Sequence, residues 1–89
     1  MRIKAFEWDE GNIGHIARHN ITPEDVEEAC CNDPLIFKGR NNRYYALGQS
    51  DNGHYLMIVF MIKFMGMARV ITARPMQDAE RKRYLRKGK

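Results

Sequence analysis

Residues able to do chemistry gather in the segment 70–84, VITARPMQDAERKRY. Arg74 ends an apolar run that predicts a strand, so its side chain would project at the rim of a sheet, where Arg81 of the following helix could join it. Glu80 and Tyr84 lie four residues apart and share one face of that helix, so Glu80 could orient either an arginine or Tyr84. The segment therefore predicts cations, a carboxylate and a phenol at one end of a sheet.

A second group of basic residues lies beside aromatic rings. Arg43 precedes Tyr44 and Tyr45. Arg69 and Arg74 are five residues apart on a predicted strand, so their side chains should point to opposite faces. Cations neutralise phosphates and aromatic rings stack on bases, so this combination favours a single-stranded nucleic acid as ligand. As a set the basic residues favour RNA or DNA, and the candidates to bind its backbone are Arg43, Lys63, Arg81 and Arg83.

Two histidines are candidates for a different kind of chemistry. His15 and His19 are four residues apart and would share a face of one helix. They could hold a metal ion only with a third ligand, such as an acid or His54, and no HExxH pattern is present. Surface or helix-capping histidines are one alternative, and proton transfer is another, because histidine titrates near neutral pH. We predict neither a metal nor a cofactor, and either histidine could be the proton-transfer group.

The sequence contains no P-loop, dinucleotide-binding fingerprint, CxxC pair or nucleophile elbow. If the protein is an enzyme acting on nucleic acid, the chemistry open to it is metal-free cleavage of RNA, in which a 2′-hydroxyl attacks its own phosphate. The protein must then position the strand, transfer protons and stabilise the crowded phosphate with cations. Arginine, lysine, histidine, tyrosine and glutamate suit that task.

The elements that must position these residues begin with a short strand. Residues 3–8 alternate between apolar and polar, which predicts a strand at the edge of a sheet. Asp9 can cap a helix over residues 10–19. The predicted buried stripe of this helix consists of Ile13, Ile16 and Ala17.

A second helix has clearer boundaries. Thr22 is a favourable N-cap, Pro23 suits the first helical position, and the helix should end near Cys31 because the residues before Pro34 avoid helical geometry. The adjacent pair Cys30 and Cys31 rarely forms a structural disulfide, so at least one of the two is predicted to be a small core residue.

The remaining pattern has the period of strands. It predicts strands over 42–49, 55–64 and 67–74, with an Asn-Gly hairpin turn near residue 52, and a final helix over 77–87. The order of elements is β-α-α-β-β-β-α. We therefore predict a single α+β domain over residues 1–89, with an antiparallel sheet and helices packed on it.

Composition narrows the class of protein further. The chain has 89 residues, of which 44% are hydrophobic and 29% charged, so it is long enough for one folded domain and not typical of disorder. Residues 1–35 carry a net charge of −5 and residues 63–89 a net charge of +7, which favours a polyanion at the basic end. The longest apolar run has eight residues and residues 1–10 contain no signal-like apolar stretch, which predicts a cytoplasmic protein without a membrane span.

Taken together, these motifs resemble the BrnT family of bacterial type II toxins, a branch of the RelE-like ribonuclease fold. Arg18-His19-Asn20 stands where the family usually has Lys-His-Gly, and Asn20 can adopt the left-handed conformation that ends a helix. The motifs that carry the resemblance are FEWD at 6–9, RHNITPEDV at 18–26, NDPL at 32–35, RYYALG at 43–48, and RVITAR at 69–74 with Glu80 and Tyr84.

The resemblance implies a small cytoplasmic ribonuclease that arrests translation. It also implies a ribbon-helix-helix antitoxin that holds the toxin inactive in a hetero-oligomer. DNA would be contacted only by the antitoxin. Within that frame we assign Arg74 to phosphate and transition-state stabilisation and His19 to proton transfer, with Glu80 and Tyr84 as positioning or proton-transfer groups. Two other classes of function stay open: a non-catalytic nucleic-acid-binding module, and an inactive member that only binds an antitoxin-like partner.

Overall fold

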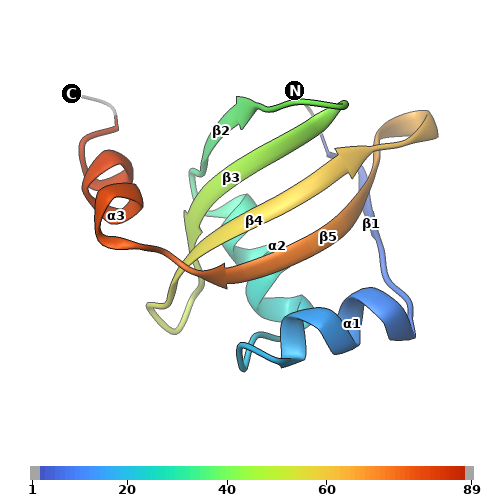
Figure 1. Ribbon diagram of the computed structural model, residues 1–89, viewed down its shortest axis with the longest axis horizontal. Helices are drawn as coiled ribbons and strands as arrows, with labels where there is room; N and C mark the ends of the chain where they lie inside the picture. Colours follow the sequence, from blue (N-terminus) through green and yellow to red (C-terminus); the bar gives the residue numbers. More distant parts are fainter. Residues whose placement is uncertain (1–2, 88–89) are drawn as a thin grey trace.

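The computed structural model describes residues 3–87, which form a five-stranded mixed sheet and three α-helices (Figure 1). The sheet has the strand order β1-β5-β4-β3-β2. None of the helices in this range is long and apolar enough to cross a membrane. The elements are β1 (Ala5–Glu7), α1 (Glu10–Ala17), α2 (Pro23–Cys31), β2 (Leu35–Lys38), β3 (Arg43–Gln49), β4 (Tyr55–Ile62), β5 (Met67–Pro75) and α3 (Asp78–Leu85), with a 3-10 turn (Phe64–Gly66) before β5.

The sheet corrects two predictions. β1 lies at an edge as predicted, but it pairs parallel with β5, so the sheet is mixed and not purely antiparallel. The predicted order of elements is present with one additional strand, β2, which the sequence reading missed. β2 follows Pro34 and pairs antiparallel with β3, which makes it the second edge of the sheet.

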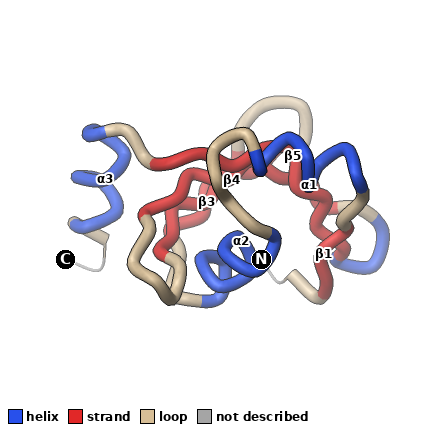
Figure 2. The backbone as a smooth tube through the Cα atoms, turned by 90° about the horizontal axis from the view of Figure 1, so that it is seen from below, coloured by secondary structure: helices blue, strands red, loops and turns tan. Residues whose placement is uncertain are grey.

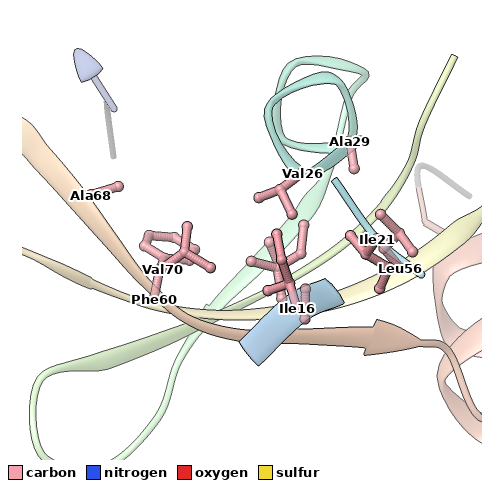
Figure 3. Packing of buried hydrophobic residues seen from close by; sticks show 11 residues of the cluster. Ile16, Ile21, Val26, Ala29, Leu56, Phe60, Ala68 and Val70 are labelled. Carbon is pink, nitrogen blue, oxygen red and sulfur yellow. The ribbon is translucent and has the colours of Figure 1, made fainter. Parts of the chain in front are cut away.

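Alternation along the strands divides the core into two clusters. Leu56, Ile58 and Phe60 of β4 face α1 and α2 and belong to the larger cluster, whereas Met57 and Val59 point to the opposite face. Figure 3 shows the larger cluster between the helices and the sheet. In Figure 2, α3 lies at one end of the strands, away from α1 and α2. Tyr84 of α3 packs in the smaller cluster with Met57 and Val59, so the two faces of the sheet are covered by different helices.

Helix α1 is held by a buried asparagine in place of the predicted apolar stripe. Asn12 completes a capping box with Asp9, and its Nδ2 donates to the backbone oxygens of Glu7 at 2.8 Å and Val70 at 3.1 Å. Because Asn12 faces the sheet, only Ile16 of the predicted stripe is buried. The other two members, Ile13 and Ala17, are exposed.

The end of α1 also differs from the prediction. The helix stops at Ala17 and not at residue 19, so His15 and His19 do not share a helical face. His19 lies in the following turn, where Asn20 has φ of 61°, the left-handed conformation predicted for it. The turn presents His19 at the surface beside the C-terminal end of β5.

Helix α2 has the predicted boundaries and lies unusually close to the sheet. Thr22 forms a capping box with Asp25, and Pro23 is the first helical residue. A Cβ atom at Gly48 of β3 would collide with the backbone oxygen of Ala29, so glycine is required at this contact. Cys30 packs against the core while its neighbour is exposed, in agreement with the prediction of one core cysteine.

A β-bulge changes the direction of the arginine side chains on β5. The register between β4 and β5 shifts at Val59/Phe60, so that Arg69 pairs with Met61 and Arg74 pairs with Met57. Paired residues share a face, and Met57 and Met61 are four apart on β4. Both arginines therefore lie on the face that α3 covers in part. The prediction of opposite faces was wrong because it assumed an unbroken strand.

Candidate functional site

A bidentate ion pair in the C-terminal segment joins β5 to α3. Arg74 donates from Nη1 and Nη2 to the two carboxylate oxygens of Glu80, each at 2.8 Å, and from Nη1 to the backbone oxygen of Pro75 at 3.1 Å. The same carboxylate accepts the backbone N–H of Gln77 at 2.8 Å, which caps the helix. The sequence left two partners open for Glu80, an arginine or Tyr84. In the structure Glu80 pairs with Arg74.

The Arg74 side chain keeps part of its binding capacity. Three of its five N–H donors are used by Glu80 and Pro75, and the two left over in the described structure, on Nε and Nη2, form the second fork of the guanidinium. The side chain is 29% exposed. A fork of this kind matches two oxygens of a phosphate. Arg74 is therefore oriented by one anion and able to bind a second.

The electrostatics of this pair define the role of Glu80. The hydrogen bonds from Arg74 hold the pKa of the Glu80 carboxyl below its ordinary value, and Glu80 in turn raises the pKa of Arg74. A carboxylate that stays ionised is a poor proton acceptor at neutral pH, since it holds a proton only weakly. Glu80 is thus suited to orienting Arg74 more than to moving protons.

A cleft of about 450 Å³ lies between the turn after α1, the β3–β4 hairpin and α3. Its polar lining includes His19, His54 and Arg81, which come from these three segments. The Arg81 guanidinium lies 4.3 Å from the centroid of the Tyr55 ring, which also lines the cleft. The structure therefore brings the predicted His19 and Arg81 together at the cleft. Arg74 and Glu80 do not line it, and their neighbours in sequence, Pro75 and Arg81, do.

His54 and Tyr55 are cleft residues to which the sequence reading gave no catalytic role. His54 was weighed only as a third metal ligand. The signal that points to both is topological: the β3–β4 turn lies at the same end of the sheet as the C-terminus of β5, because β4 and β5 are antiparallel. In residues 3–87 there is no group of three or more His, Cys, Asp or Glu side chains that could hold a metal ion.

Tyr84 lies under the site and not in the cleft. It is 7% exposed and packs edge-on against Tyr55, with 6.0 Å between the ring centroids. Lys87 covers the ring, with its Nζ 4.8 Å from the centroid. Tyr84 thus anchors α3 to the sheet and holds Arg81 and Tyr55 at the cleft.

Two of the predicted backbone-binding residues lie at the far end of the same face. Arg43 is exposed and pairs with Met61 of β4, whereas Arg74 pairs with Met57. The two methionines are four residues apart, which is about 13 Å at the usual rise of a strand. Lys63 lies just after β4 and donates to both oxygens of the Glu7 carboxylate at 3.2 Å. Arg43 is thus placed to contact an anion, whereas Lys63 already has one as its partner.

The fourth predicted backbone-binding residue, Arg83, lies on the side of α3 that faces β2. Its guanidinium is 4.4 Å from the centroid of Phe37, which stacks on Tyr45 at 5.4 Å. Both rings are partly exposed. Together with Arg43, these residues place cations and aromatic rings along one face from the cleft to the β2–β3 hairpin.

This arrangement can support a defined set of chemical steps. The open fork of Arg74 can bind a phosphate, and the cleft that the following Pro75 lines offers two imidazoles for proton transfer and the positive charge of Arg81.

Comparison with known proteins identifies a family and a similar fold. The profile of a family described as "Ribonuclease toxin, BrnT, of type II toxin-antitoxin system" matches residues 8–80. The structure is similar to the crystal structure of the Brucella abortus ribonuclease toxin BrnT, with a TM-score of 0.67 and 21% sequence identity, over 83% of this chain and 97% of that chain. At this identity the similarity concerns the fold. No curated protein sequence matches the chain.

Proposed function

Since this chain belongs to the BrnT family of ribonuclease toxins of type II toxin–antitoxin systems, we propose that it cleaves RNA without a metal ion at the Arg74 end of the sheet. The observation that carries this proposal is the Arg74 guanidinium, which Glu80 fixes through one fork while the other fork is left for a phosphate. A preorganised cation of this kind lowers the barrier most where charge develops on the phosphate oxygens.

The proposed reaction begins with attack of a ribose 2′-oxygen on the adjacent phosphorus. The new O2′–P bond forms while the bond from phosphorus to the 5′-oxygen of the next nucleotide breaks, which leaves a 2′,3′-cyclic phosphate and a 5′-hydroxyl. One group must accept the 2′-hydroxyl proton and another must give a proton to the leaving oxygen. His19 and His54 share the cleft and take these two roles.

The remaining side chains position the RNA in this proposal. Arg81 binds a phosphate beside the cleft, and Tyr55, on which it stacks, presents an aromatic ring to a base. Glu80 and Tyr84 are positioning residues, because Glu80 acts through Arg74 and Tyr84 holds α3 on the sheet. From the cleft the strand would follow the α3-covered face past Arg83, Arg43 and Lys63, toward the far end of the sheet.

Membership of the family implies an antitoxin partner and an RNA substrate. We propose further that the toxin acts in the cytoplasm by arresting translation, and that its fold is of the RelE-like ribonuclease type. The antitoxin in this proposal is a ribbon-helix-helix protein that forms a hetero-oligomer with the toxin and supplies all contacts to DNA. A stable complex of the toxin and this antitoxin on operator DNA, with no DNA binding by the toxin alone, would support the assignment.

The test of the proposed reaction is cleavage of a labelled mRNA by the purified protein in EDTA. Three variants make it specific: Arg74→Ala removes the cation, Arg74→Lys keeps the charge without the fork, and Arg69→Ala removes an arginine from the same strand and face. We expect cleavage by the wild type and the Arg69 variant, and about a 100-fold or larger loss in both Arg74 variants. Equal cleavage by all four proteins would show that Arg74 is not in the site.

The same assay separates the alternative functions. Salt-sensitive RNA binding without cleavage by any variant would identify a non-catalytic binding module. Neither binding nor cleavage, with a stable antitoxin complex, would identify a member that only binds its partner.

A further inference from the structure

Strand β2 leaves one edge of the sheet open in the described structure. It is the outermost strand on its side, and its registered partner is β3. The N–H of Gly39 donates to the oxygen of Arg43 at 2.7 Å, so this pair is a hydrogen-bonded one. Because antiparallel pairs alternate, Phe37 bonds toward β3, whereas Ile36 and Lys38 direct their backbone N–H and C=O groups outward. These are the groups to which an added strand would bond.

The open edge also carries a groove of about 440 Å³. Every residue of β2 contributes to its lining, together with Pro34 and Tyr44. Leu35, Ile36 and Phe37 are each only partly buried, so they offer apolar surface to whatever occupies the groove. A groove that follows the whole length of an edge strand fits an extended peptide.

Charge decides which kind of peptide this edge favours. Residues 34–50 contain three basic residues and no acid. The three bases, Lys38, Arg40 and Arg43, are exposed at the β2–β3 hairpin. A second copy of this chain would add its own basic residues to the same edge, and charged residues on an edge strand are a common protection against such pairing. An acidic segment would instead be attracted.

We propose that the β2 edge is the docking site for an extended, acidic segment of the antitoxin, which adds a sixth strand to the sheet. The proposal rests on the proposed function for the existence of an antitoxin. The edge is coupled to α3 by two contacts: Arg83 stacks on Phe37, and Lys87 donates to Asp33 at 2.9 Å. A segment seated on β2 therefore lies beside the helix that carries Glu80 and Arg81.

The test compares two substitutions at one exposed position. Lys38→Pro removes an outward N–H without breaking a bond to β3, and proline is tolerated on such an edge. Lys38→Ala removes the same charge and keeps the N–H. Affinity for the purified antitoxin encoded beside the toxin gene should fall by about tenfold or more from the alanine to the proline variant. Both variants should retain the wild-type circular dichroism and RNA cleavage.

A measurement on the wild type keeps the test valid if the proline variant does not fold. The Ile36 and Lys38 amides should exchange rapidly with solvent in the free toxin and slowly in the antitoxin complex. Unchanged exchange of both amides on complex formation would overturn the proposal, as would equal affinity of the two folded variants. A toxin dimer that Lys38→Pro dissociates would overturn it by assigning the edge to a second copy.

The outcomes also separate this proposal from the ribonuclease activity. Amide protection in the complex without RNA cleavage would support the docking edge and remove the proposed reaction. Cleavage with no amide protection would do the reverse.

Discussion

Replacing Glu80 by glutamine tests whether the Arg74–Glu80 pair organises the site. The substitution keeps the shape of the side chain and removes the charge that two hydrogen bonds of 2.8 Å depend on. Their side chains are 29% and 24% exposed, so the pair lies between a surface salt bridge and a buried one. We expect a loss of about 1–2 kcal/mol in the free energy of unfolding. For a domain of this size the melting temperature should fall by about 4–16 °C.

The pH dependence of the free energy of unfolding gives an independent test of the Arg74–Glu80 pair. The Glu80 pKa is lowered in the folded protein from an ordinary value of 4.5, chiefly by the hydrogen bonds from Arg74. A carboxyl with a depressed pKa contributes stability that is fully present above its unfolded pKa and is lost as the pH falls through its folded pKa. The difference in stability between wild type and Glu80→Gln should therefore be largest near neutral pH and shrink below about pH 4.5.

The assay is denaturant unfolding at several pH values, with single-turnover RNA cleavage on the same samples. Loss of orientation at Arg74 should slow cleavage by about 10- to 100-fold, less than removal of Arg74 itself. Glu24→Gln, a loss of the same charge at an exposed position in the first turn of α2, is the matched control. A Glu80→Gln variant with wild-type stability and wild-type cleavage would refute the reasoning.

Three further predictions concern the core and the cysteines. Gly48→Ala should cost about 2 kcal/mol or more, measured by denaturant unfolding, because the added Cβ meets the backbone of Ala29. Asn12→Ala should cost about 1–3 kcal/mol in the same measurement, because two carbonyl oxygens lose their donor. Iodoacetamide at pH 8 should label Cys31 and spare Cys30 until the protein unfolds, because burial first, and then the neighbouring negative charges, raise the pKa of Cys30 to about 12. Equal labelling rates of the two thiols, read by mass spectrometry, would contradict this.

The parts of the fold that local signals determine could be predicted well. Helix α2 has the predicted boundaries because its start depends on Thr22 and Pro23 and its end on the Asn-Asp-Pro sequence, all within the segment itself. Helix α1 was harder to predict, since one of its two buried positions is Asn12, whose side chain donates hydrogen bonds to carbonyl oxygens on β1 and β5. A periodicity of apolar residues cannot detect such a contact.

The features that depend on pairing between distant segments were the ones missed. The four residues of β2 form a strand because β3 offers them partners, and the direction of β1 is set by β5. The bulge opposite Val59/Phe60 is likewise a property of two strands, and it alone brings Arg69 and Arg74 to one face.

The candidate site, too, could be predicted only where its residues lie close together in the sequence. Arg74 and Glu80 are only six residues apart, at a strand end and in the helix that follows it, so the sequence could suggest their pairing. His54 enters the cleft only through the position of the β3–β4 turn next to the end of β5. A histidine outside any motif gives no signal of this kind before the topology is known.

The most direct test of the central claim is the chemical identity of the ends that the protein produces. A short RNA with one cleavable position, treated with the wild-type protein in EDTA, should yield a 2′,3′-cyclic phosphate and a 5′-hydroxyl. The same RNA with a 2′-deoxy sugar at that position should stay intact. Products with a 3′-hydroxyl and a 5′-phosphate, or cleavage of the deoxy-substituted RNA, would contradict attack by the 2′-oxygen and the site built around Arg74.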